Sequence, residues 1–319
     1  MTAPILRVTD LSRSFTVSQP YPRPAQELRA VDGVDIEIGP AETLGIVGES
    51  GCGKSTLARM VLKLLKPSRG RIELDGRDVT HFGERAMRPM RRRIQAVFQD
   101  PMSSLNPRLR VRDIIAEPLW PLRLGRRRAT ERVREMLSLV GLPEDADMRY
   151  PHAFSGGQRQ RIAIARALAA EPRLVICDEA TSALDVSVQA QILNLIGDLQ
   201  SRLGLSLMFI SHNLGAVRHL SHRVAVMYLG RIVESAREQD LFDRPAHPYT
   251  IALLAAVPEP IVDQHATAPL AGEIPSPLHR PTGCHFHPRC PKAEGRCRTE
   301  DPALRPRRDG HLVRCHFPE

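Results

Sequence analysis

The residues between positions 48 and 56 have the types and spacing of a phosphate-binding loop. Gly48, Gly53, Lys54 and Ser55 fit the pattern G-x-x-x-x-G-K-[ST]. Glycines let the main chain wrap closely around phosphate groups, so that successive N–H groups face the negative charge. A lysine at this spacing can reach the terminal phosphates, and the Ser55 hydroxyl can bind Mg²⁺. The predicted loop consists of Gly48, Glu49, Ser50, Gly51, Cys52, Gly53, Lys54, Ser55 and Thr56.

A second candidate for chemistry is a pair of carboxylates, Asp178 and Glu179, which follows the apolar run Leu174–Cys177. Asp178 could hold the Mg²⁺ shell, and Glu179 could orient or polarise an attacking water. Because strands often end in acidic residues, the pattern alone is also explained by an ordinary strand end. The phosphate loop earlier in the chain favours the functional interpretation.

The run Phe154–Arg161 is the most discriminating motif. Ser155 is suited to cap a helix, and the glycines at 156 and 157 expose backbone amides to an anion. A plain capped helix explains Ser155 and one glycine. It does not explain the whole string in a chain that also has a nucleotide site.

The segments around these motifs alternate between strands and helices. An apolar strand over 43–47 leads into the glycines and a helix that starts near Lys54. Apolar strands over 173–179 and 205–212 flank a helical pattern over 186–204. Strand–helix–strand order predicts a parallel sheet built from crossover units.

Other segments predict smaller features. Residues 34–38 alternate as a half-buried strand does, and a Pro-rich loop over 19–26 precedes them. Hairpins are predicted around Asp75-Gly76 and Leu229-Gly230. Residues 101–170 are Arg-rich and helical in character.

Composition sets limits on the class of protein. The chain has 319 residues, 42% of them apolar and 25% charged, which excludes a disordered or fibrous protein. The net charge of +9 suits a polyanionic partner. No apolar run approaches the roughly 18–20 residues of a membrane span, and the first residues lack a secretory signal. We therefore expect an intracellular protein that reaches a membrane only through partners.

The last part of the chain carries a separate cluster of cysteines. From 258 to 319 prolines and glycines are frequent and periodicity is lost, which predicts a small irregular extension. Cys284, Cys290, Cys297 and Cys315 have the spacing C-x₅-C-x₆-C-x₁₇-C. Four thiolates can hold Zn²⁺ or an iron–sulfur cluster, and the lack of a short C-x₂-C pair disfavours zinc. Unliganded reduced cysteines are the alternative. Three histidines adjoin the cysteines, namely His285, His287 and His316. They could substitute as metal ligands, although ordinary solvated loop histidines are the plainer interpretation.

The motifs together resemble the ATP-binding subunit of an ABC transporter over roughly residues 5–255. The matching motifs, in the family's order, are Walker A at Gly48–Thr56, the Q-loop Gln99, the signature Phe154–Gln158, Walker B at Leu174–Glu179, the D-loop Ser182–Asp185 and the switch His212. The resemblance implies a P-loop NTPase core with a mostly parallel sheet, an antiparallel β subdomain and a helical subdomain at about 101–170. The ATPase domain would occupy residues 1–257.

The resemblance also implies roles for single residues. Phe15 would stack on adenine, although a core aromatic is the alternative, and Gln99 would join the network of Mg²⁺ and water. His212 would contact the γ-phosphate. Members of the family work as head-to-tail pairs, so the signature residues Ser155, Gly156, Gly157 and Gln158 would serve an ATP bound to the partner subunit. Asp185 of the D-loop would also belong to the nucleotide site. Phe154, Ala180 and Asn213 depart from the family's usual residues without removing a group that touches phosphate or metal.

Other segments are similar to the oligopeptide/dipeptide importer ATPases, and to the second of their two paired ATPases. They are QDPMSSLNPR, YPHAFSGGQRQR, MYLGRIVE, HPYT and AGEIPSPLHRPTGCHFHPRCP. This resemblance implies peptide import at the cytoplasmic face of the membrane, with a second ATPase (a heterodimer more than a homodimer), two permeases and, indirectly, a substrate-binding protein. It also favours a [4Fe–4S] cluster over Zn²⁺ on the four cysteines.

Three alternatives remain. Nickel importers share much of the pattern, so nickel or another small solute is the alternative cargo. A nucleic-acid ATPase of the same superfamily would suit the positive charge. Chromosome-maintenance members, however, have a long coiled coil between Walker A and the signature, and only about 100 residues separate Lys54 from Ser155. Translation-factor members have two cassettes, and this chain has one. An exporter is disfavoured by the unfused cassette and the importer-type tail.

Overall fold

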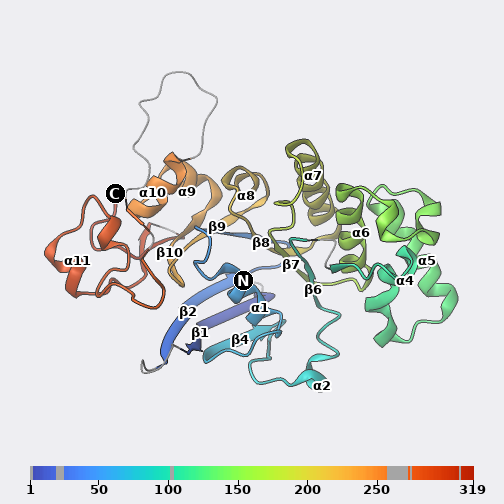
Figure 1. Cartoon of the computed structure of the whole chain (residues 1–319), viewed down its shortest axis with the longest axis horizontal. Helices are drawn as coiled ribbons and strands as arrows, with labels where there is room; N and C mark the ends of the chain where they lie inside the picture. Colours follow the sequence, from blue (N-terminus) through green and yellow to red (C-terminus); the bar gives the residue numbers. More distant parts are fainter. Residues whose placement is uncertain (1–2, 19–24, 101–103, 257–271, 274, 309) are drawn as a thin grey trace. The chain divides into compact units, whose positions relative to one another are not determined.

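A computed structural model describes residues 3–18, 25–100, 104–256, 272–273, 275–308 and 310–319 (Figure 1). The chain forms two compact units. The first unit consists of Met1–Leu6, Ile38–Thr43 and Glu73–Ser211, and the second of Arg7–Glu37, Leu44–Ile72 and His212–Glu319. Most of the predicted Pro-rich loop, and the start of the predicted extension, lie outside the described residues.

The first unit contains three parallel strands in the order β6, β7, β8. Their bounds are Ile94–Val97, Leu174–Asp178 and Ser206–Ile210. Every residue of β8 is buried, as is usual for a parallel strand that is covered on both faces. The helix α7 (Val186–Leu203) connects β7 to β8. The predicted crossover unit is therefore confirmed; Asp178 is the last residue of its first strand, β7, and Glu179 follows it.

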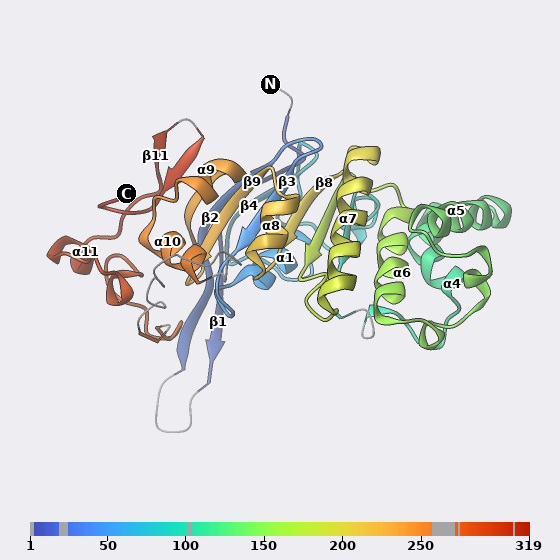
Figure 2. The same ribbon diagram turned by 90° about the horizontal axis from the view of Figure 1, so that it is seen from above.

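The same unit carries a group of helices in place of further strands, as predicted for residues 101–170. They are α4 (Val111–Ala116), η1 (Glu117–Leu122), α5 (Arg126–Leu139), η2 (Glu144–Met148), η3 (Pro151–Ala153) and α6 (Gly156–Ala169). Figure 2 shows α4, α5 and α6 packed together. Their buried faces present Ile114, Val133 and Ile162 to a common core. Within the described ranges, no helix has both the length and the apolar character needed to cross a bilayer.

The second unit is built on an antiparallel hairpin of β9 (Arg223–Tyr228) and β10 (Arg231–Arg237). Leu229 and Gly230 form its turn with φ of 43° and 84°, which confirms the predicted hairpin. The fully buried strand β3 (Thr43–Val47) pairs in parallel with β9. Helix α1 (Lys54–Val61) begins where the sequence predicts.

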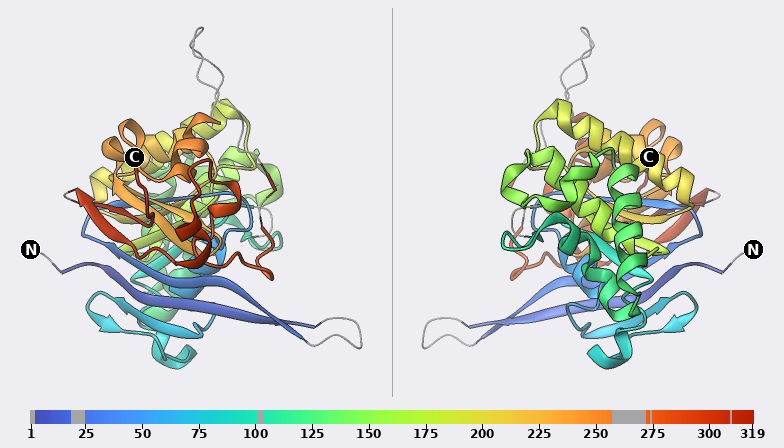
Figure 3. Two further views of the ribbon diagram at one scale, coloured as in Figure 1. Left: turned by 90° about the vertical axis from the view of Figure 1, so that its left-hand side faces the viewer. Right: turned by 90° about the vertical axis from the view of Figure 1, so that its right-hand side faces the viewer.

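A separate sheet has the strand order β2, β1, β4, β5. Their bounds are β1 Leu6–Val17, β2 Gln26–Ile38, β4 Arg69–Leu74 and β5 Arg77–Asp78, and the short helix α2 (Glu84–Met87) follows. Figure 3 shows β1 and β2 side by side as an extended ribbon. In β2, Val34, Ile36 and Ile38 are buried while the residues between them are exposed, as predicted. The hairpin at Asp75-Gly76 is also confirmed.

Before the extension, the second unit contains the helices α8 (Leu214–Leu220), α9 (Glu238–Asp243) and α10 (Pro248–Ala255). The extension over 258–319, predicted to be irregular, contains η4 (His287–Arg289), α11 (Gly295–Thr299), β11 (Arg305–Arg308) and β12 (His311–Val313). Strand β12 pairs with β10, so the extension adds to the sheet. Strands of three and four residues are too short to show a periodicity in the sequence.

A buried carboxylate joins β10 to the segments that follow it. Glu234 has no exposed surface and accepts the backbone N–H groups of Ala246 at 2.7 Å and His247 at 2.9 Å. His311 of β12 lies 2.7 Å from the same carboxylate through Nε2. Because all three contacts are shielded from water, removing the acceptor leaves several donors unpaired at once.

We expect Glu234→Ala to lower the free energy of unfolding by about 3–5 kcal/mol, because several buried groups lose their acceptor at about 1–3 kcal/mol each. Denaturant unfolding of the full chain measures it. Glu300→Ala is the matched control, because Glu300 pairs with Arg296 at 2.7 Å on the exposed surface, where such pairs contribute about 1 kcal/mol or less. Equal, small effects of both substitutions would contradict the assignment.

Candidate functional site

The predicted phosphate loop lies between β3 and α1 in the second unit, and close packing of the main chain fixes its shape. Gly48 and Gly53 have φ of 153° and 108°. A Cβ on Gly48 would lie 2.1 Å from the carbonyl oxygen of Met227, and one on Gly53 would lie 2.2 Å from that of Ala30. No residue with a side chain fits at either position, so the glycines of the motif are required by sterics.

Lys54 is folded into the loop that precedes it. Its side chain is buried, and Nζ donates to the carbonyl oxygens of Gly48 at 2.7 Å and Glu49 at 2.9 Å. Among the described residues this ammonium contacts two neutral carbonyls and, at 3.8 Å, the Cys52 sulfur, and a buried ammonium in such surroundings suits an anionic ligand. Cys52 is buried beside it, and burial raises the pKa of its thiol, so it packs as a neutral group.

Two further predicted residues belong to the second unit. Phe15 on β1 is half-buried, and the guanidinium of Arg13 lies 4.8 Å from the centre of its ring. The ring is therefore not part of a closed core. His212 follows β8 and is exposed, just before Asn213, whose side chain caps α8 by accepting the N–H of Ala216 at 3.1 Å.

The predicted carboxylates in the first unit lie at the end of β7, where both are half-buried. Glu179 has a φ of 51°, an unfavourable value for a residue with a side chain. Its N–H donates to the carbonyl of Ile210 at 2.9 Å, and its own carbonyl accepts from the Ser182 hydroxyl at 3.0 Å. These contacts hold the strained turn. Burial raises the pKa of the preceding Cys177 to about 12, which keeps that thiol neutral.

The signature motif caps helix α6 as the sequence predicts. The Ser155 hydroxyl accepts the N–H of Gln158 at 3.3 Å, and the Gln158 side chain accepts the N–H of Ser155 at 3.0 Å. Ser155, Gly156 and Gln158 are exposed, so the motif is open to an external ligand. A Cβ on Gly157 would lie 2.5 Å from the Val188 side chain, which explains the second glycine.

The remaining predicted residues of the first unit lie on its surface. Gln99 is exposed just after β6, and Asp185 is exposed at the position that precedes α7. Residues 101–103 of the segment that follows Gln99 lie outside the described part of the chain.

The four cysteines of the extension line one pocket, together with His287 and His316. All four are free thiols. Burial raises the pKa of Cys284 to about 11, and it also raises those of Cys290 and Cys315. In the described residues, however, no group of three or more His, Cys, Asp or Glu side chains is arranged to hold a metal ion.

Two of the histidines next to the cysteines contact backbone carbonyl oxygens. His287 Nδ1 lies 2.9 Å from the Cys284 carbonyl oxygen, and His316 Nε2 lies 2.9 Å from that of Glu300. Burial lowers the pKa of His285 to about 4. The structure thus gathers the predicted thiols but does not preform a metal site among them.

Two residues near the phosphate loop are missing from the sequence prediction. The N–H of Glu49 donates to the Tyr249 hydroxyl at 3.0 Å, and the Glu49 carboxylate pairs with Arg289 at 2.8 Å. Tyr249 belongs to the HPYT segment and Arg289 to the cysteine-bearing tail. Neither lies at a spacing from the loop that a sequence pattern could reveal.

Comparison with known proteins agrees with this geometry. Residues 31–182 match the family described as ABC transporter, and residues 233–297 match the C-terminal region of oligopeptide/dipeptide transporters. A protein of Sinorhizobium fredii named "Probable peptide ABC transporter ATP-binding protein" is 50% identical over 99% of this chain and 90% of its own length. The oligopeptide transport ATP-binding protein AppF of Bacillus subtilis is 47% identical over 98% of this chain and 97% of its own.

A solved structure supports the same assignment. A dimeric ATP-binding cassette in a post-hydrolysis state with ADP and Pi matches with a TM-score of 0.65 and 26% identity, over 73% of this chain and 98% of its own. The relatives match along the whole chain, including the extension with its cysteines. The chain therefore belongs to the ATP-binding subunits of ABC transporters, in the family that carries the oligopeptide/dipeptide transporter C-terminal region.

Proposed function

We propose that the chain hydrolyses ATP to energise the import of peptides through a membrane permease. The observation that carries the proposal is the sterically fixed loop at residues 48–56 with the Lys54 ammonium folded into it. Relatives named for peptide or oligopeptide transport, about half identical along the whole chain, support peptides over nickel as the cargo.

The proposed roles follow from the chemistry of each side chain. Lys54 and the loop amides bind the phosphates, while Phe15 stacks on the base. The oxygen donors Ser55, Gln99 and Asp178 are of the type that Mg²⁺ prefers, and the ion when bound would neutralise phosphate charge. Glu179 accepts a proton from the attacking water, and His212 contacts the γ-phosphate. Ser155–Gln158 and Asp185 serve the ATP bound to a second cassette.

The exposed signature motif supports a second subunit as partner. The helix start is exposed, and Ser155 and Gln158 cap each other's backbone N–H groups, so the remaining N–H groups are accessible to an anion bound by a second subunit. We place the chain in a heterodimer with a second ATPase. This pair would bind two permeases at the cytoplasmic face of the membrane, and a substrate-binding protein would be an indirect partner. Nucleic acid has no place in this assembly.

The cysteine pocket is the second element of the proposal. Four free thiols on one pocket are the donor set of a [4Fe–4S] cluster, with Zn²⁺ as the alternative. Because the thiols are not preformed as a metal site, the ligand would have to draw them together. Such a group would supply folding energy to the extension.

We expect Glu179→Gln to slow ATP turnover by about a hundredfold or more, because the amide keeps the shape of the side chain but cannot accept the proton. ATP-driven peptide uptake by the complex reconstituted with its permeases, together with steady-state ATPase activity, measures it. ATP affinity should stay close to that of the wild type.

Lys54→Ala is the contrasting variant, because it removes the ammonium that contacts the phosphates and so weakens ATP binding itself. Turnover of Glu179→Gln within a few-fold of wild type, or normal ATP affinity of Lys54→Ala, would contradict the proposed roles.

For the extension, we expect the anaerobically purified protein to contain iron and sulfide and to absorb visible light broadly. Cys290→Ser should lose both. Cys177→Ala is the control, because Cys177 lies in β7, apart from the cysteine pocket. Stoichiometric zinc without iron would assign the site to zinc, and absence of both metals would show that the cysteines are unliganded.

A further inference from the structure

A residue of the C-terminal extension forms an ion pair with the phosphate loop. The two terminal nitrogens of Arg289 lie 2.8 and 3.0 Å from the two carboxylate oxygens of Glu49, 240 residues earlier. The side chains are only 4% and 21% exposed. Two-point pairing of an arginine with a carboxylate fixes both groups in direction as well as distance, and low exposure limits screening by solvent.

The main chain of Glu49 is held as well. Its N–H donates to the hydroxyl of Tyr249, a fully buried residue whose ring centre lies 4.7 Å from that of Tyr228 and 5.4 Å from that of Phe286. Phe286 comes from the extension. The second residue of the phosphate loop is therefore fixed through both its backbone and its side chain by groups that lie outside the loop.

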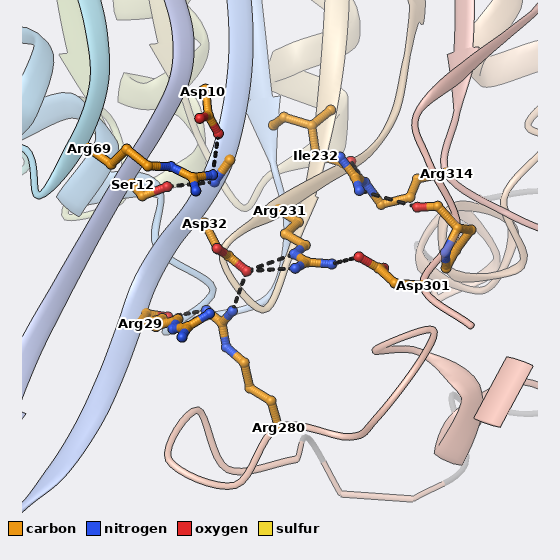
Figure 4. Close-up of polar contacts among 12 residues, drawn as sticks. Asp10, Ser12, Arg29, Asp32, Arg69, Arg231, Ile232, Arg280, Asp301 and Arg314 are labelled. Atoms are coloured by element: carbon orange, nitrogen blue, oxygen red, sulfur yellow. Dashed lines mark hydrogen bonds and ion pairs between the residues drawn. The ribbon is translucent and has the colours of Figure 1, made fainter. Parts of the chain in front are cut away.

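The extension has other attachments nearby, which do not use Arg289. Asp32 on β2 pairs with Arg231 at 2.7 Å and with Arg280 of the extension at 2.8 Å, and Arg231 reaches Asp301 at 2.6 Å (Figure 4). Strand β12 is paired with β10. Replacing Arg289 should therefore leave the extension docked.

We propose that Arg289 is a positioning residue for ATP binding. It holds Glu49 in the shape that the loop needs and neutralises a carboxylate that would otherwise repel the triphosphate. Glu49 directly follows Gly48, and its carbonyl accepts a hydrogen bond from the Lys54 ammonium, so its charge lies next to the phosphate-binding main chain. This inference depends on the proposed function of residues 48–56 as the phosphate site.

The test compares charge variants of the full-length chain by calorimetric titration with Mg-ATP and with adenosine. Arg289→Gln leaves the Glu49 charge without its partner, so we expect ATP to bind at least about tenfold more weakly, which is the repulsion between two unit charges roughly 12 Å apart at an effective dielectric constant of about 20. Adenosine, which has no phosphate charge, should bind unchanged. The loss for ATP should shrink at high salt.

The double variant Glu49→Gln/Arg289→Gln removes the repelling charge, and we expect its ATP affinity to return to within about twofold of wild type. Arg296→Gln is the matched control, since it lies in the same extension but pairs with Glu300 on the exposed surface. It should leave ATP binding unchanged. Thermal unfolding of each variant shows whether the fold is retained.

The outcomes separate this inference from the one on which it depends. If the wild type does not bind Mg-ATP, the phosphate site itself is misassigned. If the wild type binds Mg-ATP and Arg289→Gln binds it equally well, the positioning role is overturned. A loss that is the same for ATP and adenosine, and that the double variant does not reverse, would also overturn it and leave Arg289 a purely structural role.

Discussion

The close approach of main chain to main chain at Gly48 and Gly53 is the constraint on which the second unit depends. The carbonyls of Met227 on β9 and Ala30 on β2 occupy the space that side chains at these positions would need. Two strands thus press the loop into one shape, and the N–H of Gly230 donates to the Cys52 carbonyl at 2.9 Å from the β9–β10 turn. Because β9 and β2 belong to different sheets, the shape of the loop at residues 48–56 depends on strands from both.

Charged side chains around residues 48–56 are arranged so that the loop keeps one buried positive charge. The Lys54 ammonium contacts the Gly48 carbonyl, and the Glu49 carboxylate is paired with Arg289. Asp32 on β2 forms ion pairs with two arginines, Arg231 and Arg280, and Arg280 belongs to the extension. The extension is therefore joined to the segments around residues 48–56 by shielded ion pairs, and to β10 by a short strand pairing.

Local patterns in the sequence predicted the backbone conformation around several candidate site residues, and contacts between distant segments were not predictable from them. The helix start at Lys54 and the reciprocal cap of Ser155 with Gln158 are encoded within a few residues, so propensity and spacing suffice. The pair of Glu49 with Arg289 joins distant segments, and β12 is too short to show a pattern. From the cysteine spacing we predicted that the four thiols cluster, and all four line one pocket. Spacing in the sequence does not determine the distances between the sulfur atoms, and among the described residues the thiols do not form a preformed metal site.

Amide hydrogen exchange of the full chain, measured by mass spectrometry with and without Mg-ATP, tests most directly whether residues 48–56 are the phosphate site. Phosphate groups bound by the loop amides would protect these N–H groups, because exchange requires them to open to water. We predict slower exchange in peptides that cover 48–56 once Mg-ATP is bound. Saturating Mg-ATP that leaves exchange at 48–56 unchanged while protecting another segment would contradict the assignment.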